Sequence, residues 1–114
     1  MRVSSISDKF YSMLGLCQRA GKLVSGGMLC ENSIRSGKAQ MVIVSNEASE
    51  GTLEKFTNLC RYYNTELVIA GQKEQLGHAI GKFSRTVLVV LDKVFKEMLT
   101  NLLNQNEIQH GGDQ

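Results

Sequence analysis

The run MVIVS at residues 41–45 decides the fold class. It is apolar on both faces and rich in β-branched side chains, a pattern typical of a central strand that is covered by helices on both sides. Two further apolar runs predict strands, ELVIA at 66–70 and TVLVVL at 86–91, and a short extended piece is expected at 22–24. Strands and helices alternate along the chain, which predicts an α/β protein folded as a three-layer α/β/α sandwich around a parallel or mixed sheet.

Apolar residues at helical spacing predict the helices between these strands. The first spans about residues 5–19, with Ser5 or Ser7 as its cap, and the second begins at the pair Gly26 and Gly27 and ends at Gly37. A third helix is expected over residues 49–64, a short one carries Leu76 and Ile80, and a last one follows Asp92. The second helix therefore starts on a glycine loop.

The chain has 114 residues, no proline and no internal repeat, which predicts one domain. We expect residues 1–104 to form it and residues 105–114 to be a flexible tail. The longest apolar run, residues 87–91, is far shorter than the ~18–20 residues of a membrane span. The first twenty residues do not follow the pattern of a signal peptide. These features predict a cytoplasmic protein with no membrane association.

No motif in the chain predicts catalysis, a metal or a cofactor. Three cysteines without a CxxC pair indicate buried thiols, not a disulfide framework or zinc site. The string GHAIGK at residues 77–82 is one residue too short for a phosphate-binding loop and has Phe83 where serine or threonine is needed. His78 and His110 stand apart from any acidic or cysteine cluster. We therefore expect a protein that is not an enzyme.

The small net charge of +2 conceals an uneven distribution. Residues 1–40 hold six basic and two acidic side chains, a net charge of +4, whereas residues 41–81 carry −2. A second basic group follows Gly81 and consists of Lys82, Arg85, Lys93 and Lys96. Clustered cations are a footprint for polyanions such as RNA, although exposed lysine and arginine are also ordinary surface residues.

The loop Ser25, Gly26 and Gly27 adds a reason to expect phosphate. Small residues let backbone N–H groups approach a phosphate, and the helix that follows places the positive end of its dipole there. Many helices begin in this way without a ligand. The aromatic pair Tyr62 and Tyr63 lies at a helix end, where we expect packing and not base stacking.

Three segments together resemble the ribosomal protein L-seven-Ae / L-thirty-e superfamily. They are RAGKLVSG at residues 19–26, IRSGKAQMVIVS at 34–45 and LGHAIGK at 76–82. The chain is most similar to the small bacterial YlxQ-like branch, over roughly residues 5–100. The resemblance implies a four-stranded mixed sheet between helices and binding to structured RNA of the kink-turn type, in which a bent duplex presents tandem sheared G·A pairs.

The family holds RNA with a helix that begins G-x-N-E-x-x-K and with a loop after the LG-x-A-x-G segment. Here Gly26 matches, whereas Met28 and Leu29 replace the Asn and Glu that read guanine, and Asn32 replaces the Lys. From the resemblance, the glycine loop and the flanking basic residues together, we expect RNA contacts from Lys22, Ser25, Gly26, Gly27, Met28, Leu29, Asn32, Arg35, Lys38, Lys82 and Arg85.

Together with the basic clusters, the resemblance implies a noncatalytic RNA-binding protein, which we expect to be monomeric and to bind structured, ribosomal-type RNA in translation or ribosome-associated processes. Contacts with the ribosome or a translation factor are also expected. The alternative is a protein-interaction module of the same machinery that has lost kink-turn recognition, with Met28 and Leu29 in an apolar contact patch.

Overall fold

The computed structural model describes residues 6–112, with side chains described for residues 6–105. Helices and strands alternate in this part of the chain, and each predicted element is present. The ends predicted for the elements before the last helix differ by up to three residues, whereas the last helix continues to Gly112. The elements are α1 Asp8–Arg19, β1 Leu23–Ser25, α2 Gly27–Arg35, β2 Met41–Val44, α3 Glu50–Tyr62, β3 Glu66–Ile69, α4 Lys73–Ala79, β4 Val87–Val90 and α5 Lys93–Gly112.

The four strands form one mixed sheet in the order β1-β4-β2-β3. The α3 crossover makes β2 and β3 parallel, whereas β4 runs antiparallel to both β1 and β2. Val44 therefore pairs with Val87 at one end of the sheet, and Met41 pairs with Val90 at the other. We call these the glycine end, where β1 also finishes at Ser25, and the far end. The predicted mixed sheet is confirmed.

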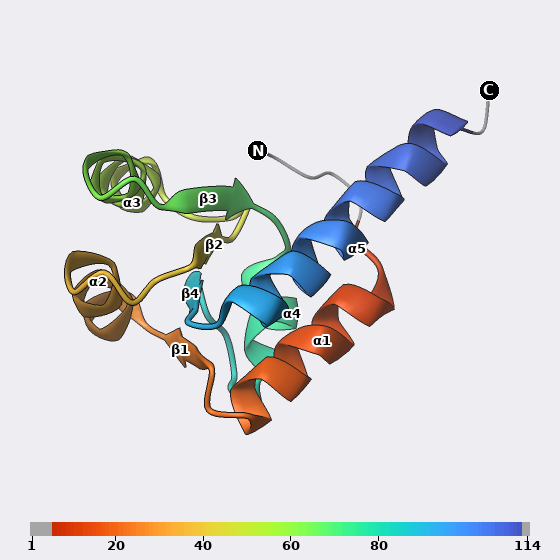
Figure 1. Cartoon of the computed structure of the whole chain (residues 1–114), viewed down its shortest axis with the longest axis horizontal. Helices are drawn as coiled ribbons and strands as arrows, with labels where there is room; N and C mark the ends of the chain where they lie inside the picture. The colour runs from red at the N-terminus through yellow and green to blue at the C-terminus, as the bar shows by residue number, and fades with distance from the viewer. Residues whose placement is uncertain (1–5, 113–114) are drawn as a thin grey trace.

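Helices cover both faces of the sheet, which confirms the three-layer sandwich. Figure 1 shows α2 and α3 on one side and α1, α4 and α5 on the other. The side chains of β2 alternate between the two cores: Ile43 packs in the cluster of α1, α4 and α5, whereas Val42 packs with Ile34 of α2 and Phe56 of α3. All four residues of β2 are fully buried, which explains why residues 41–45 contain no polar residue before Ser45.

Side-chain caps fix the starts of three helices where the sequence predicts them. The Ser7 hydroxyl accepts from the Phe10 N–H at 3.3 Å, and Ser49 accepts from Thr52 at 3.1 Å. Asp92 Oδ2 accepts from the Phe95 N–H at 3.0 Å. Each cap satisfies one N–H that the helix itself leaves without an acceptor.

The last helix continues to Gly112, and its side chains from residue 106 onward lie outside the described part of the chain. The flexible tail expected at residues 105–114, separate from a domain of residues 1–104, therefore stays a prediction. Among the helices of the described residues, none combines the length and the apolar character that a membrane crossing needs.

Candidate functional site

The glycine end of the sheet carries the loop from which α2 starts. Gly26 precedes the helix with φ +90°, a backbone conformation that only glycine adopts readily, and no atom lies within 4 Å of a Cβ placed there. Space is also open around Gly27. The backbone of this loop is therefore accessible to a ligand, and backbone conformation, not crowding, requires glycine at position 26.

The start of α2 differs from the starts of the other helices in the described residues. A carboxylate lies at each of those starts: Asp8 in α1, Glu50 in α3, Glu47 at α4 through the Lys73 N–H at 2.9 Å, and Asp92 at α5. The first turn of α2 has neither an acidic residue nor a side-chain cap. The Gly26 N–H donates to the Val87 carbonyl at 3.4 Å, but no side chain among the described residues caps the N–H groups of the first turn or balances the positive end of the helix dipole. This favours an external anion at this position.

Arg85 lies beside this loop and is fixed in place. Its Nε donates to Ser25 Oγ at 3.0 Å and its Nη1 donates to the Ser84 carbonyl at 2.7 Å. These two bonds leave three of the five guanidinium N–H groups without an acceptor among the described residues. The glycines and Arg85 border a hollow of about 370 Å³, so the structure brings together Ser25, Gly26, Gly27 and Arg85.

The position of Arg85 depends on a close approach between α4 and the loop before β4. A Cβ on Gly77 would lie 2.4 Å from Ser84 Cα, so no larger residue fits unless the loop moves. The backbone N–H of Arg85 also donates to the Lys73 carbonyl at 2.9 Å. The first glycine of the segment LG-x-A-x-GK is Gly77, and packing explains it, because only a residue without a side chain leaves room for the backbone of Ser84.

Ser45 connects three loops at the glycine end. This hydroxyl is buried, donates to the Gly71 carbonyl at 2.9 Å, and accepts from the Glu47 N–H at 3.0 Å. Its own N–H donates to the Thr86 carbonyl at 2.8 Å. The loops after β2 and β3 and the loop before β4 are thus bonded to one another through Ser45.

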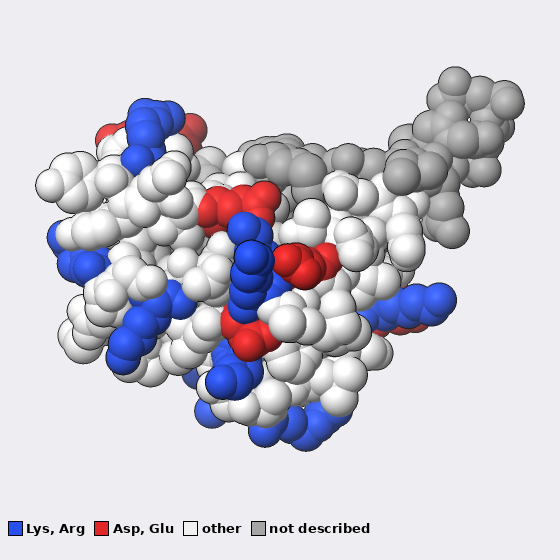
Figure 2. All heavy atoms as spheres, viewed as in Figure 1, with Lys and Arg blue, Asp and Glu red and all other residues white. Residues whose placement is uncertain are grey.

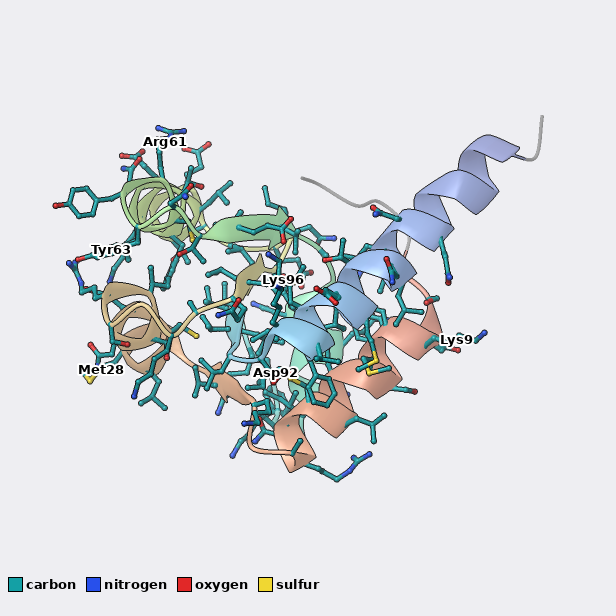
Figure 3. The ribbon with its side chains drawn as sticks, in the orientation of Figure 1. Lys9, Met28, Arg61, Tyr63, Asp92 and Lys96 are labelled. Atoms are coloured by element: carbon teal, nitrogen blue, oxygen red, sulfur yellow. The ribbon has the colours of Figure 1, made fainter. Side chains whose placement is uncertain are left out.

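Three large apolar side chains are exposed on the elements that border the loop. Met28 and Leu29 in the first turn of α2 are 79% and 58% exposed, and Phe83 is 81% exposed. Figure 3 shows Met28 projecting from α2 away from the sheet. Lys82 is also exposed and precedes Phe83 on the loop before β4. The sequence marks Phe83 only as a mismatch to a phosphate-binding loop, and no local pattern predicts that its side chain is exposed.

Two of the predicted cations lie at the far end of the sheet. The Lys22 carbonyl accepts from the Leu91 N–H at 2.8 Å, and Lys38 precedes Gln40, whose N–H donates to the Val90 carbonyl at 2.8 Å. Leu91 lies six positions after Arg85 on the other side of β4, which corresponds to about 20 Å of extended chain. Lys22 and Lys38 therefore do not flank the glycine loop, contrary to the expectation from the sequence.

The second basic group predicted after Gly81 is also divided. Lys93 and Lys96 follow β4 at the far end, where Lys96 Nζ lies 3.7 Å from Glu66 Oε1. Figure 3 labels Asp92 and Lys96 at the centre of this view, and Figure 2 shows acidic side chains around the basic ones there. The far end is therefore a mixed surface, and Lys82 and Arg85 alone represent this group at the glycine end.

Arg35 and Asn32 lie further along α2. Arg35 Nε contacts Glu31 Oε2 at 3.0 Å, and Lys55 Nζ of α3 contacts Glu31 Oε1 at 2.7 Å. Hydrogen bonds from Lys55 first, and from Arg35, lower the pKa of Glu31. Asn32 is exposed. Lys55 also borders the hollow beside the glycine loop; it was missed because no local pattern shows that α3 lies beside α2.

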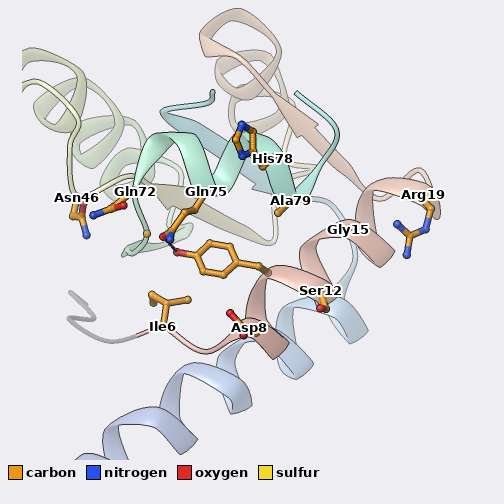
Figure 4. Close-up of a pocket in the computed structure, with 12 residues that line it drawn as sticks. Ile6, Asp8, Ser12, Gly15, Arg19, Asn46, Gln72, Gln75, His78 and Ala79 are labelled. Atoms are coloured by element: carbon orange, nitrogen blue, oxygen red, sulfur yellow. Dashed lines mark hydrogen bonds between the residues drawn. The ribbon is translucent and has the colours of Figure 1, made fainter. Parts of the chain in front are cut away.

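A separate hollow of about 680 Å³ lies between α1 and α4 (Figure 4). The Tyr11 hydroxyl donates to Gln75 Oε1 across it at 2.9 Å, and burial raises the pKa of Tyr11. None of the predicted RNA-binding residues lines this hollow. We interpret the Tyr11 to Gln75 contact as a structural link between the two helices.

The three thiols are buried, as the sequence predicts. Burial raises the pKa of Cys17 and Cys60 to about 11 and that of Cys30 to about 12. A thiol with so high a pKa holds very little thiolate at neutral pH and is a poor nucleophile. Across the described residues, no group of three histidine, cysteine or acidic side chains is placed to hold a metal ion.

The fold and the open glycine loop define an α/β/α protein with a candidate anion-binding surface at the start of α2. Residues 8–100 match the model of the ribosomal protein L7Ae/L30e/S12e/Gadd45 family. The chain belongs to this family, and the resemblance found in the sequence is confirmed.

Two relatives carry the description "RNA-binding protein YlxQ". The protein from Bacillus subtilis (strain 168) is 36% identical over 96 residues, which cover 84% of this chain and 96% of that protein. The protein from Enterococcus faecium is 34% identical over 96 residues, covering 84% and 92%. The chain thus aligns with nearly the full length of both relatives.

Two solved structures share the fold. A protein of unknown function from Bacillus halodurans superposes with a TM-score of 0.82 at 33% identity, over 86% of this chain and 99% of that one. The 15.5kD RNA binding protein of Giardia lamblia superposes with a TM-score of 0.73 at 14% identity, over 91% and 92%. At 14% identity the second match shows that the fold is shared and nothing more.

Proposed function

We propose that this chain is a noncatalytic RNA-binding protein that contacts RNA phosphates at the glycine end of its sheet. The observation that carries the proposal is the open Gly26 loop at the uncapped start of α2, with the Arg85 guanidinium fixed beside it by Ser25. Backbone N–H groups and a guanidinium that has free donors are suited to phosphate oxygens. Two relatives with the description "RNA-binding protein" support the same function.

The RNA we propose is structured, of the kink-turn type, and bound by a cytoplasmic, monomeric protein in translation or ribosome-associated processes. Met28 and Leu29 offer no hydrogen bonds to base edges, so they contact bases or sugars through apolar surface. Lys82 adds a phosphate contact on the loop before β4. Phe83, with 81% of its surface exposed, is placed to pack against an unstacked base.

The test compares two charge deletions at opposite ends of the sheet. Arg85→Ala removes the cation beside the glycine loop, and Lys22→Ala is the matched control at the far end. We expect Arg85→Ala to weaken binding of a synthetic kink-turn RNA about tenfold and to reduce the slope of log K against log salt by about 1. Lys22→Ala should change neither. Fluorescence anisotropy over a range of salt concentrations measures both quantities.

Equal losses for Arg85→Ala and Lys22→Ala would contradict a site at the glycine end. An affinity that does not vary with salt would contradict phosphate contacts altogether. Crosslinking in cells, followed by sequencing of the attached RNA, identifies the natural ligand.

A protein-interaction module is the second candidate function, favoured by the exposure of Met28, Leu29 and Phe83 at one end of the molecule. In that case a partner protein covers these apolar side chains. Pull-down before and after nuclease treatment distinguishes the two functions, because a direct protein partner remains bound when RNA is removed.

A further inference from the structure

The groove between α2 and α3 continues from the glycine loop. Both helices start at the glycine end, and Lys55 borders the hollow beside Gly26 and Gly27 as well as a second hollow of about 510 Å³. The lining of the second hollow comes from both helices and consists of Arg35, Lys55, Asn58, Leu59, Tyr62 and Tyr63. A strand of RNA that leaves the glycine loop therefore meets this groove without crossing another element.

Tyr62 lies at the end of this groove with an open ring. The side chain is 81% exposed, although the sequence predicts packing for both tyrosines. Its ring contacts the ring of Tyr63 edge to face, with centroids 4.9 Å apart and an angle of 72° between the planes. Tyr63 is half-buried against the core of α2 and α3. The neighbour thus supports Tyr62 while most of the ring stays free to stack on a base.

The groove also carries excess positive charge. Arg35 and Lys55 share the single carboxylate of Glu31, and their side chains remain 51% and 54% exposed. Two cations on one carboxylate leave a net charge of +1, and no acidic residue lines the hollow. Cations next to an exposed aromatic ring are the combination by which proteins hold single-stranded nucleic acid.

The length of the groove suits a short run of nucleotides. Tyr62 lies ten positions after Thr52, which is beside the glycine loop, and this offset corresponds to about 15 Å along α3. We propose that this groove binds unpaired nucleotides that flank the structured RNA, with a base stacked on Tyr62 and phosphates near Arg35 and Lys55. The inference rests on the proposed function, since it extends the same RNA beyond the glycine loop.

The experiment compares a blunt kink-turn RNA with the same RNA carrying a short oligoadenosine extension at its 5′ or 3′ end. We expect one extension to raise the affinity of the unaltered protein. Tyr62→Ala should remove that gain, about tenfold, and leave the blunt RNA unchanged. Tyr62→Phe keeps the ring and should bind as the unaltered protein does. Arg61→Ala is the matched control, because Figure 3 shows Arg61 on the side of α3 away from α2.

The outcomes separate this inference from the proposed function. If Arg85→Ala weakens both RNAs while Tyr62→Ala weakens neither, the groove inference fails and the proposed function stands. Equal weakening of blunt and extended RNA by Tyr62→Ala also overturns it, as does an extension that adds no affinity. If the unaltered protein binds neither RNA, the proposed function fails and this inference with it.

Discussion

Gly77→Ala tests whether the packing of α4 sets the position of Arg85. A Cβ at residue 77 would lie 2.4, 2.7 and 2.8 Å from the Cα, N and carbonyl C of Ser84. Ordinary contacts begin near 3.4 Å, so the backbone at Ser84 must shift by about 1 Å to relieve the clash. A shift of that size is enough to break the 3.0 Å bond from Arg85 to Ser25.

The expected loss of stability follows from two opposing effects. Overpacking of this kind costs about 1–3 kcal/mol, while replacing glycine by alanine inside a helix contributes up to about 1 kcal/mol. Gly51→Ala in α3 provides a control, since nothing lies within 4 Å of a Cβ at residue 51. Both variants gain a similar free energy from replacing glycine by alanine in a helix. Gly77→Ala should therefore be less stable than Gly51→Ala by about 1–3 kcal/mol in unfolding free energy, roughly 4–12 °C in Tm.

Urea unfolding of the two variants measures the difference, and anisotropy with kink-turn RNA measures its effect on binding. We expect Gly77→Ala to bind RNA more weakly than Gly51→Ala. Equal unfolding midpoints would refute the argument that Ser84 is tightly packed. A destabilised Gly77→Ala that binds RNA normally would show that the bond between Arg85 and Ser25 does not govern affinity.

Three further predictions concern buried groups. Ser45→Ala should lower the unfolding free energy by about 1–3 kcal/mol in urea titrations, because the N–H of Glu47 loses its acceptor and the Gly71 carbonyl loses a donor; a neutral substitution would contradict this role. The three thiols should react with an alkylating reagent at neutral pH only after unfolding, measured by mass spectrometry. Because burial raises the pKa of Cys30 from 9.0 to about 12, the protonated thiol is favoured in the folded state, so stability should be unaffected below about pH 9 and fall as pH rises towards 12. Thermal melts across that range test the direction.

The fold could be predicted because its signals are local. A short apolar run rich in β-branched residues is typical of a strand covered on both faces, and Ser7, Ser49 and Asp92 stand where their helices need a cap. Asn64 follows α3 with φ +53°, and asparagine is one of the few residues that tolerate this left-handed conformation. Each of these predictions depends on residues close together in the chain.

The surface could not be predicted in the same way because it depends on strand direction. Lys22 and Ser25 are three residues apart in the chain, yet β1 carries them to opposite ends of the sheet. Arg85 and Lys93 are separated by β4 in the same manner. A count of basic residues along the sequence therefore adds together cations from the glycine end and the far end of the sheet. Only the pairing of β4 with its neighbours shows which of them lie near Gly26.

The exposure of Met28, Leu29 and Phe83 has a consequence for how proteins of this family diverge. Side chains that contact little of their own protein can be exchanged with small effects on folding, typically within about 0.5 kcal/mol, while the bonds of Ser45 and the fit at Gly77 keep the loops in place. The ligand that such a protein prefers can therefore change almost independently of the stability of its fold. A few substitutions in one helical turn can redirect such a protein to a new partner, and an engineer could use the same positions without rebuilding the domain.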